Sequence, residues 1–407
     1  EHYTCFSIPK KYGNGTRMIV APDNDLKSIQ RFLYLLIKNQ LGENFEFKWC
    51  VQAYQKGRGI FTNAQIHRNK KYIIHTDLKD YFPSINFGRV SGYFKKSPLF
   101  HLESSMAYFF ANLLCFKEEL PQGAPTSPII ANLISRRLDS KLLILSNKYH
   151  FTYSRYADDL TFSTNDVHMV KEQTTNFIKD IKKIVCYEGF ILNTAKTRID
   201  NPHSRHKVTG LTNNKRVSST KDFYLSTRAM CEHLYNKNSF YCGNEVHNVY
   251  SKSSLIKCLQ ILEGRYAFIN DIEDKNRNLY IEHKGGNEYH SITSTDFLET
   301  KYSASGNQGA QTRIFSGKKL AYSKFAFFKT FHAGDIIHIF SEGKTDPRYI
   351  QSANSALNIN LPIKVRNFDM METENQNKYA QLFLAGSGAG ALINLIELYQ
   401  GSNPTPP

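Results

Sequence analysis

Residues 151–163 read FTYSRYADDLTFS, two strand-like runs on either side of Ala157-Asp158-Asp159. This pattern predicts a β-hairpin that carries two adjacent carboxylates at its turn. Earlier in the chain, residues 71–76 (KYIIHT) predict a short strand that ends at a third carboxylate, Asp77. An acid at a strand end and a pair on a hairpin turn can converge on two Mg²⁺ ions, which prefer oxygen ligands. A lone Asp-Asp is more often a solvated turn, so the surrounding sequence has to decide.

The composition describes a basic, folded protein of more than one domain. The chain has 407 residues, of which 41% are hydrophobic, and it carries a net charge of +16. The charge favours a polyanionic partner, nucleic acid before a membrane surface. From residue 335 onward there are seven acids and five bases, so the first 334 residues hold +18 and are the expected nucleic-acid-binding part. No apolar run is long enough to span a membrane, and the seven cysteines form no CxxC pair, which favours reduced thiols in a cytoplasmic protein.

The remaining elements follow from periodicity and breaker residues. Residues 25–39 predict a helix capped by Asp25, with an apolar face made of Ile29, Phe32, Leu33, Leu36 and Ile37. Another helix is expected to begin at Ser127, with Pro128 in its first turn. Residues 213–275 read as helical and basic, and residues 276–317 as a polar linker or irregular insertion. After it, strand, helix and strand are expected at 336–340, 347–357 and 363–368, which predicts a small α/β domain.

Several motifs occur together in one order: DLKDYF at 77–82, LPQGAPTSP at 120–128 and YADDL at 156–160. In this combination they resemble the palm of a reverse transcriptase. IPKKYGNGTRMIVAP at 8–22 and the helix after it resemble the fingers of that family. Asn63-Ala64-x-x-His67 and Val208-Thr209-Gly210 narrow the resemblance to retron reverse transcriptases, over roughly residues 6–270.

The resemblance implies an α/β chain built as an α+β right-hand polymerase. Fingers and a ferredoxin-like palm would occupy residues 1–212, a helical thumb 213–275 and a linker 276–330. Asp77 and Asp158 would be the principal metal ligands and Asp159 a weaker one. Lys196 would protonate the departing pyrophosphate, with an ordinary surface lysine as the alternative.

Further roles are implied for the nucleotide pocket and for RNA recognition. Phe82 would be the steric gate against a ribose 2′-hydroxyl, Lys10 and Arg17 would bind the triphosphate, and Gln122 would line the dNTP pocket. The two retron motifs would contact the cognate RNA, through Asn63, His67, Val208, Thr209 and Gly210. A buried structural histidine is the alternative for His67.

The C-terminal part carries a second resemblance. DIIHIFSEGKTDPRYI at 335–350 places Glu342 just beyond a hydrophobic strand and is similar to the first motif of a TOPRIM domain. There Glu342 would act as general acid/base or Mg²⁺ ligand. The second TOPRIM motif, Asp-x-Asp, is absent and Asp369 is no substitute, so residues 331–407 correspond to the front part of such a domain.

Together the resemblances imply a retron RNA-directed DNA polymerase with a TOPRIM nuclease effector. It would copy its cognate structured non-coding RNA into branched msDNA from dNTPs, with two Mg²⁺ ions, in bacterial anti-phage defence of the toxin–antitoxin kind. A homo-oligomer on msDNA is compatible with this. A group II intron-type enzyme should show a maturase region after the thumb, and an RNA-dependent RNA polymerase a Gly-Asp-Asp motif and a small gate residue. A non-catalytic RNA-binding scaffold would tolerate loss of the three acids, which are all present.

Overall fold

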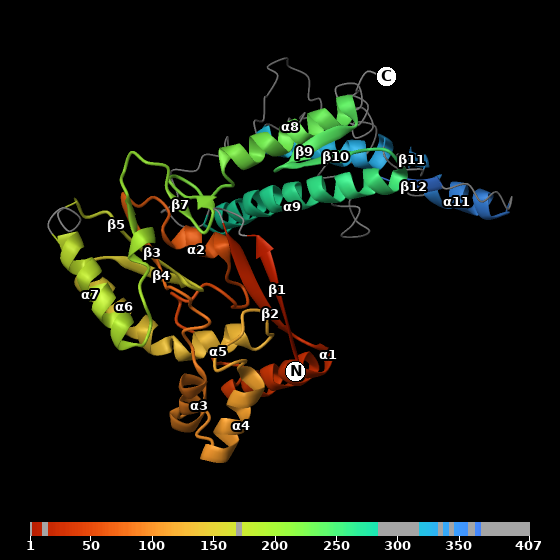
Figure 1. Cartoon of the computed structure of the whole chain (residues 1–407). Coiled ribbons are helices and arrows are strands. Elements are labelled where there is room, and N and C mark those ends of the chain that lie inside the picture. The colour runs from red at the N-terminus through yellow and green to blue at the C-terminus, as the bar shows by residue number, and fades with distance from the viewer. Residues whose placement is uncertain are drawn as a thin grey trace. The chain divides into compact units, whose positions relative to one another are not determined.

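The computed structural model describes residues 2–9, 15–167, 173–283, 317–332, 337–341, 346–356 and 363–367 (Figure 1). The chain divides into two compact units, Glu1–Val217 and Ser218–Pro407. The first ends five residues beyond the expected end of the palm at residue 212. No helix in the described ranges is long and apolar enough to cross a bilayer.

A four-stranded antiparallel sheet forms the centre of the first unit. Its strands are β3 (Tyr72–Asp77), β4 (Thr152–Tyr156), β5 (Asp159–Thr164) and β6 (Arg198–Asp200), in the order β4-β5-β3-β6. The pairing of Tyr156 with Asp159 leaves only two residues in the turn between β4 and β5, which confirms the predicted hairpin. The pairing of β3 with β5 sets Asp77 opposite Asp159. The sheet register therefore brings together acids that lie 82 positions apart in the sequence.

Helices on one side of this sheet bury its apolar side chains. They are α5 (Ser127–Ile134), α6 (Arg136–Lys148) and α7 (Thr174–Tyr187). Phe177 of α7 stacks on Phe151 at 4.3 Å between ring centroids and meets the Phe162 ring edge-on at 5.2 Å. Aromatic rings in these arrangements add to the hydrophobic burial, so the sheet has a stiff support.

The N-terminal part of the first unit contains a two-stranded ribbon and several helices. Strands β1 (Tyr3–Pro9) and β2 (Thr16–Pro22) pair antiparallel, and α1 (Asn24–Leu41), α3 (Phe87–Lys96) and α4 (Ser104–Leu114) follow. The expected cap of α1 is wrong, because Asp23 and not Asp25 accepts the Leu26 N–H. The expected apolar face is also partly wrong: the buried residues are Leu26, Gln30, Leu33 and Ile37, whereas Ile29, Phe32 and Leu36 are exposed.

Gln30 explains why the buried face of α1 is rotated. Its amide donates to the Leu113 carbonyl and to the Tyr3 hydroxyl, each at 2.8 Å. A buried polar group with partners costs little, so α1 packs against α4 and β1 through a residue that a hydrophobic pattern passes over.

The second unit is mainly helical, as expected for residues 213–275. It contains α8 (Lys221–Lys237), the hairpin of β9 (Ser239–Cys242) and β10 (Glu245–Asn248), and α9 (Lys252–His283). The expected linker over 276–330 differs from the structure at both ends. Residues 276–283 continue α9, and α10 (Gly317–Phe327) buries Phe325 against Tyr266, with ring centroids 5.1 Å apart. Ala321, Tyr322 and Phe325 give α10 a packing face that outweighs its polar composition.

The last described elements are β11 (Ile337–Ser341), α11 (Asp346–Ala356) and β12 (Ile363–Asn367). The two strands are parallel, with Ile337 opposite Ile363. The predicted strand–helix–strand order is confirmed to within a residue or two at each end. Glu342 and residues 368–407 lie outside the described residues.

Candidate active site

Three carboxylates meet at one end of the central sheet. Asp77 ends β3 and is only 6% exposed, Asp159 begins β5 opposite it, and Asp158 occupies the intervening turn. Two backbone bonds fix their positions: the Leu78 N–H donates to the Asp158 carbonyl at 2.9 Å, and the Asn193 N–H donates to the Asp77 carbonyl at 2.8 Å. The backbone therefore holds the acids together before any ligand is considered.

The electrostatics of this cluster are those of crowded negative charges. Burial, followed by the charges of Asp158 and Asp77, raises the pKa of Asp159 to about 6. Burial and the charge of Asp77 also raise the pKa of Asp158, while the charges of Lys196 and Arg17 lower it. Both ionised acids therefore gain from a nearby cation.

The Lys196 ammonium already lies beside one of the three acids, Asp77. Lys196 is the last residue of the short 3-10 helix η2 (Thr194–Lys196), and its ammonium donates to Asp77 Oδ2 at 3.0 Å. The Asn193 amide donates to the same oxygen at 3.3 Å. Among the residues that the structure describes, no three His, Cys, Asp or Glu side chains form a group that could hold a metal ion as they stand.

Phe82, the expected steric gate, packs against two tyrosine rings. The Phe82 ring is partly buried, 5.3 Å from the Tyr81 ring and 6.4 Å from the Tyr54 ring. Burial and then the charge of Asp158 raise the pKa of Tyr54 to about 12, and the charge of Arg17 opposes that rise. Tyr54 and Arg17 therefore both interact electrostatically with Asp158, and the nucleotide-binding role of Arg17 stays a prediction.

The LPQG segment is joined to the β1–β2 ribbon. The Val20 N–H donates to the Gln122 carbonyl at 3.0 Å. A Cβ atom on Gly123 would lie 2.7 Å from the Val20 carbonyl oxygen, and the φ angle of Gly123 is +145°. Only glycine fits here, because it alone allows so close an approach of the two backbones. The contact places Gln122 beside the strand that carries Arg17, whereas Lys10 lies outside the described part of the chain.

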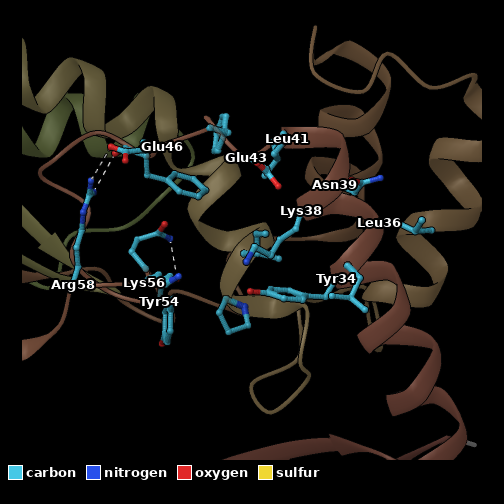
Figure 2. A pocket seen from close by; sticks show the side chains of 18 of the residues that line it. Tyr34, Leu36, Lys38, Asn39, Leu41, Glu43, Glu46, Tyr54, Lys56 and Arg58 are labelled. Carbon is cyan, nitrogen blue, oxygen red and sulfur yellow. Dashed lines mark hydrogen bonds and ion pairs between the residues drawn. The ribbon is translucent and has the colours of Figure 1, made fainter.

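A large open groove is lined in part by Tyr54 (Figure 2). Its volume is about 1270 Å³, and its walls come from the C-terminal half of α1, residues 43–58 and the start of α5. Tyr34 and Lys38 of α1 face it, and so do Tyr54, Lys56 and Arg58 of the facing loop. Sequence reasoning missed this groove, because these residues meet only through the tertiary fold.

The retron motif Asn63-Ala64-x-x-His67 lies on α2 (Ile60–Ile66) and its C-cap, against the palm strands. His67 is fully buried, and its ring nitrogens each lie 2.7 Å from a serine hydroxyl, Ser163 Oγ on β5 and Ser154 Oγ on β4. The Ser154 hydroxyl donates to Asn63 Oδ1 at 2.6 Å. Burial lowers the pKa of His67 to about 3, so the ring is neutral. This geometry favours the structural alternative, and direct RNA contact by the two side chains stays a prediction.

The second retron motif lies against the first. Val208 ends β7 (Lys207–Val208), and Thr209 and Gly210 form the turn before β8 (Leu211–Thr212). The Thr209 hydroxyl donates to the Ile60 carbonyl at 3.0 Å, and the Asn213 amide donates to the His67 carbonyl at 2.9 Å. Val208 is fully buried. The two motifs, about 140 residues apart in sequence, thus form one packed unit on the palm.

Comparison with known proteins agrees with this arrangement. Residues 8–213 match the family described as reverse transcriptase (RNA-dependent DNA polymerase). The retron Ec86 reverse transcriptase of Escherichia coli is 32% identical over 283 residues, which cover 69% of this chain and 79% of that protein. The chain belongs to the retron reverse transcriptase family.

Other similarities are more limited in extent. The retron Mx162 reverse transcriptase of Myxococcus xanthus is 35% identical over 231 residues, 52% of this chain, and the match spans about half (47%) of that relative's length. Among solved structures, telomerase from Candida albicans in complex with a fragment of telomeric RNA aligns over 70% of this chain and 61% of its own, with a TM-score of 0.42 and 12% identity. The family match ends at residue 213, before the segment that carries the TOPRIM resemblance.

Proposed function

We propose that the chain is an RNA-directed DNA polymerase that uses Asp77, Asp158 and Asp159 for metal-dependent nucleotidyl transfer. The observation that carries the proposal is the register of β3 and β5, which sets Asp77 opposite Asp159 with Asp158 in the adjoining turn. Family membership supports it. The crowded carboxylates, two of them with raised pKa values, are a donor set that suits Mg²⁺.

Mg²⁺ would lower the pKa of the attacking 3′-hydroxyl and neutralise the pyrophosphate that leaves. Asp77 and Asp158 would be its main protein ligands and Asp159 an auxiliary one. Asp77 would hold the ion in competition with the Lys196 ammonium, which already bonds its Oδ2. Lys196, released on the exposed side of the site, would stand ready to give a proton to the leaving group.

The neighbouring groups would select and hold the nucleotide. The Arg17 guanidinium can bind triphosphate oxygens with its planar fork, and Gln122 is held beside the Arg17 strand by the bond to Val20. Phe82, fixed between Tyr81 and Tyr54, would exclude a ribose 2′-hydroxyl and so favour dNTPs. Lys10 would assist at the triphosphate.

We propose that the groove next to Tyr54 receives the single-stranded RNA template. Tyr34 and Tyr54 offer surfaces on which bases can stack, and Lys38 and Lys56 offer charge to phosphates. The Arg58 guanidinium already donates to the carbonyls of Phe47, Lys48 and Val51 and so shapes the groove wall. Tyr54 also interacts electrostatically with Asp158, so the proposed template path runs from this groove toward the carboxylates at Tyr54.

The finer proposal is that the template is the cognate retron RNA and the product is branched msDNA. The two retron motifs support it, because both are present and the segments that carry them are hydrogen-bonded to each other on the palm. We further propose that residues 331–407 begin a TOPRIM nuclease with Glu342 in its metal site, acting in anti-phage defence. The parallel β11–α11–β12 unit fits that fold class and carries no catalytic argument.

The decisive experiment is primer extension on an RNA template with dNTPs and Mg²⁺, for the wild-type chain and for Asp158→Asn. We expect the variant to lose extension by at least about 1,000-fold while RNA binding is retained. A variant that still extends would refute the metal assignment. RNA binding without extension by the wild-type chain would instead favour the non-catalytic scaffold.

The retron proposal has its own test. Nucleic acid that co-purifies with the protein expressed from its native locus is treated with RNase and with a 2′,5′-debranching enzyme, then resolved on a denaturing gel. A short DNA whose mobility changes after debranching supports msDNA synthesis. DNA that is linear before treatment would support a reverse transcriptase of another kind, such as the group II intron type.

A further inference from the structure

Arg155 is the largest fully buried side chain of the described core, and it lies three residues before Asp158. Its guanidinium donates two hydrogen bonds to the Asp139 carboxylate on α6, from Nε to Oδ1 at 2.8 Å and from Nη2 to Oδ2 at 2.8 Å. Arg155 and Asp139 are 0% and 1% exposed. A buried ion pair gains little stability over well-packed apolar residues, so its presence beneath the carboxylates suggests a role in geometry.

The remaining nitrogen of Arg155 reaches the catalytic turn. Nη1 donates to the Ala157 carbonyl oxygen at 3.1 Å. Ala157 has a φ of +56°, a left-handed conformation that alanine seldom adopts, and it directly precedes Asp158. The bond therefore holds a strained backbone in place at the residue that aims the Asp158 side chain.

The same nitrogen, Nη1, also bonds to groups that are next to Phe82 and, through Asn132, to Tyr54. It donates to the Tyr81 hydroxyl at 2.9 Å, next to the gate residue Phe82. It donates to Asn132 Oδ1 at 3.1 Å, and the Asn132 amide passes the connection on to the Ala53 carbonyl at 3.0 Å, next to Tyr54.

The backbone of Arg155 adds a further link to the same loop. Its N–H donates to the Cys50 carbonyl at 2.8 Å, and its carbonyl accepts from the Gln52 N–H at 2.9 Å. Residues 50–52 are therefore hydrogen-bonded to strand β4 at Arg155, and the Ala53–Tyr54 segment follows them directly in the chain.

We infer that Arg155, fixed by Asp139, is a positioning residue that sets the Asp158 turn, the Phe82 gate and the Tyr54 wall relative to one another. It touches no substrate and acts through the groups it bonds. The inference rests on the proposed polymerase function and adds to it the residue that coordinates metal binding with nucleotide selection. No single-ended donor can replace the guanidinium, because five bonds diverge from one planar group.

The test compares Arg155→Lys with Arg89→Lys in the full chain. Arg89 is a matched control: its guanidinium also donates to backbone carbonyls, of Ser84, Glu188 and Gly189, and stacks on Phe190, but it bonds nothing at the catalytic turn. Each variant is assayed for thermal unfolding, RNA binding, kcat, the dNTP KM and the Mg²⁺ concentration that gives half-maximal extension.

We expect Arg155→Lys to lower kcat by roughly 100-fold, the loss typical of a misplacement of about 1 Å. It should also raise the half-maximal Mg²⁺ concentration several-fold, with RNA binding unchanged. Arg89→Lys should lower the unfolding temperature but keep the wild-type Mg²⁺ dependence. Equal Mg²⁺ dependence in both variants and the wild-type protein would overturn the inference.

Tyr81→Phe provides a second variant should Arg155→Lys not fold. It keeps the ring that packs beside Phe82 and removes the hydroxyl, which accepts from Arg155 and also bonds Ser135 Oγ and the Ala131 carbonyl. A shift of the Mg²⁺ dependence or of the dNTP-to-rNTP preference at an unchanged unfolding temperature supports the inference, and no shift in either contradicts it. Wild-type protein that never extends a primer would refute the polymerase proposal instead, so the two failures are distinct.

Discussion

The Lys196 ammonium lies 3.0 Å from Asp77 Oδ2, so the expected proton donor and an expected metal ligand form an ion pair. Lys196 is 67% exposed while Asp77 is 9% exposed in its side chain, which makes the lysine the mobile partner. An ion pair with one exposed member is weak, and a divalent cation can displace it.

Lys196→Met therefore has two opposite effects to measure. We expect kcat for extension to fall roughly 100-fold or more, because the leaving pyrophosphate loses its acid. The Mg²⁺ concentration for half-maximal extension should fall as well, since Asp77 no longer exchanges a lysine for the ion. Lys183→Met, which breaks the exposed Lys183–Asp180 pair, is the control and should change neither value. A lower kcat with a higher Mg²⁺ requirement would contradict the exchange.

Asp159 predicts a specific dependence of stability on pH. Its pKa is raised from 3.8 to about 6, so the folded protein retains a proton that the unfolded chain has released. This group therefore makes folding progressively less favourable as the pH rises from about 4 to 6. Residue Asp159 has an exposed surface even though the surrounding protein crowds its carboxylate, so solvent reduces the size of the effect.

In metal-free buffer, Asp159→Asn should raise the unfolding temperature at pH 7 and flatten its change between pH 4 and 6. The exposed Asp25→Asn should keep the wild-type profile. At limiting Mg²⁺, wild-type extension should decline as the pH falls through about 6, because protonated Asp159 binds the ion less well. A wild-type profile in Asp159→Asn would show that the three acids do not interact.

Phe82→Val should relax nucleotide selection. The smaller side chain leaves room for a 2′-hydroxyl, and we expect the preference for dNTP over rNTP to fall roughly 10- to 100-fold in kcat/KM. Competing extension with dGTP and rGTP measures this ratio. Phe87→Leu, a similar change at a ring that packs on Tyr108, should leave the ratio unaltered. An unchanged ratio in Phe82→Val would remove Phe82 from the gate.

Gly123→Ala tests the junction of the LPQG segment with β2. The added Cβ would lie 2.7 Å from the Val20 carbonyl oxygen at a φ of +145°, so the two segments must separate. We expect a loss of about 1–3 kcal/mol of stability and a raised KM for dNTP, because Arg17 and Gln122 no longer share one support. Urea unfolding and steady-state kinetics measure the two effects. Gly92→Ala, on open helix surface, is the control.

His67→Ala distinguishes a structural role from RNA contact. It leaves the Ser154 and Ser163 hydroxyls without their buried partner and opens a cavity, at a cost of about 2–5 kcal/mol. The RNA affinity of the protein that remains folded at low temperature should change less than about twofold. Lys71→Ala, which removes an exposed lysine side chain four residues further along the chain, should weaken RNA binding modestly without loss of stability. Full stability combined with a tenfold loss of RNA affinity would restore RNA contact for His67.

The local elements around the site were predictable because their signals are local. The alternation around residues 157–159 and the strand ending at Asp77 required only the period of a β-strand, and both agree with the structure. The motifs also identified the acids and the retron family. Errors arose where a polar residue is buried, as for Gln30 on α1, and where aromatic packing outweighs a polar composition, as for α10.

The amino-acid sequence thus determined the hairpin, the three acids, the basic first part and the family, since each depends on residue types at short spacing. Only the tertiary structure decided that Asp77 faces Asp159, that Lys196 pairs with Asp77 and that the two retron motifs pack together. It also revealed the central place of Arg155, whose position in the sequence suggests only a charged strand residue. Contacts between segments tens of residues apart depend on register and packing, which no single stretch of chain encodes.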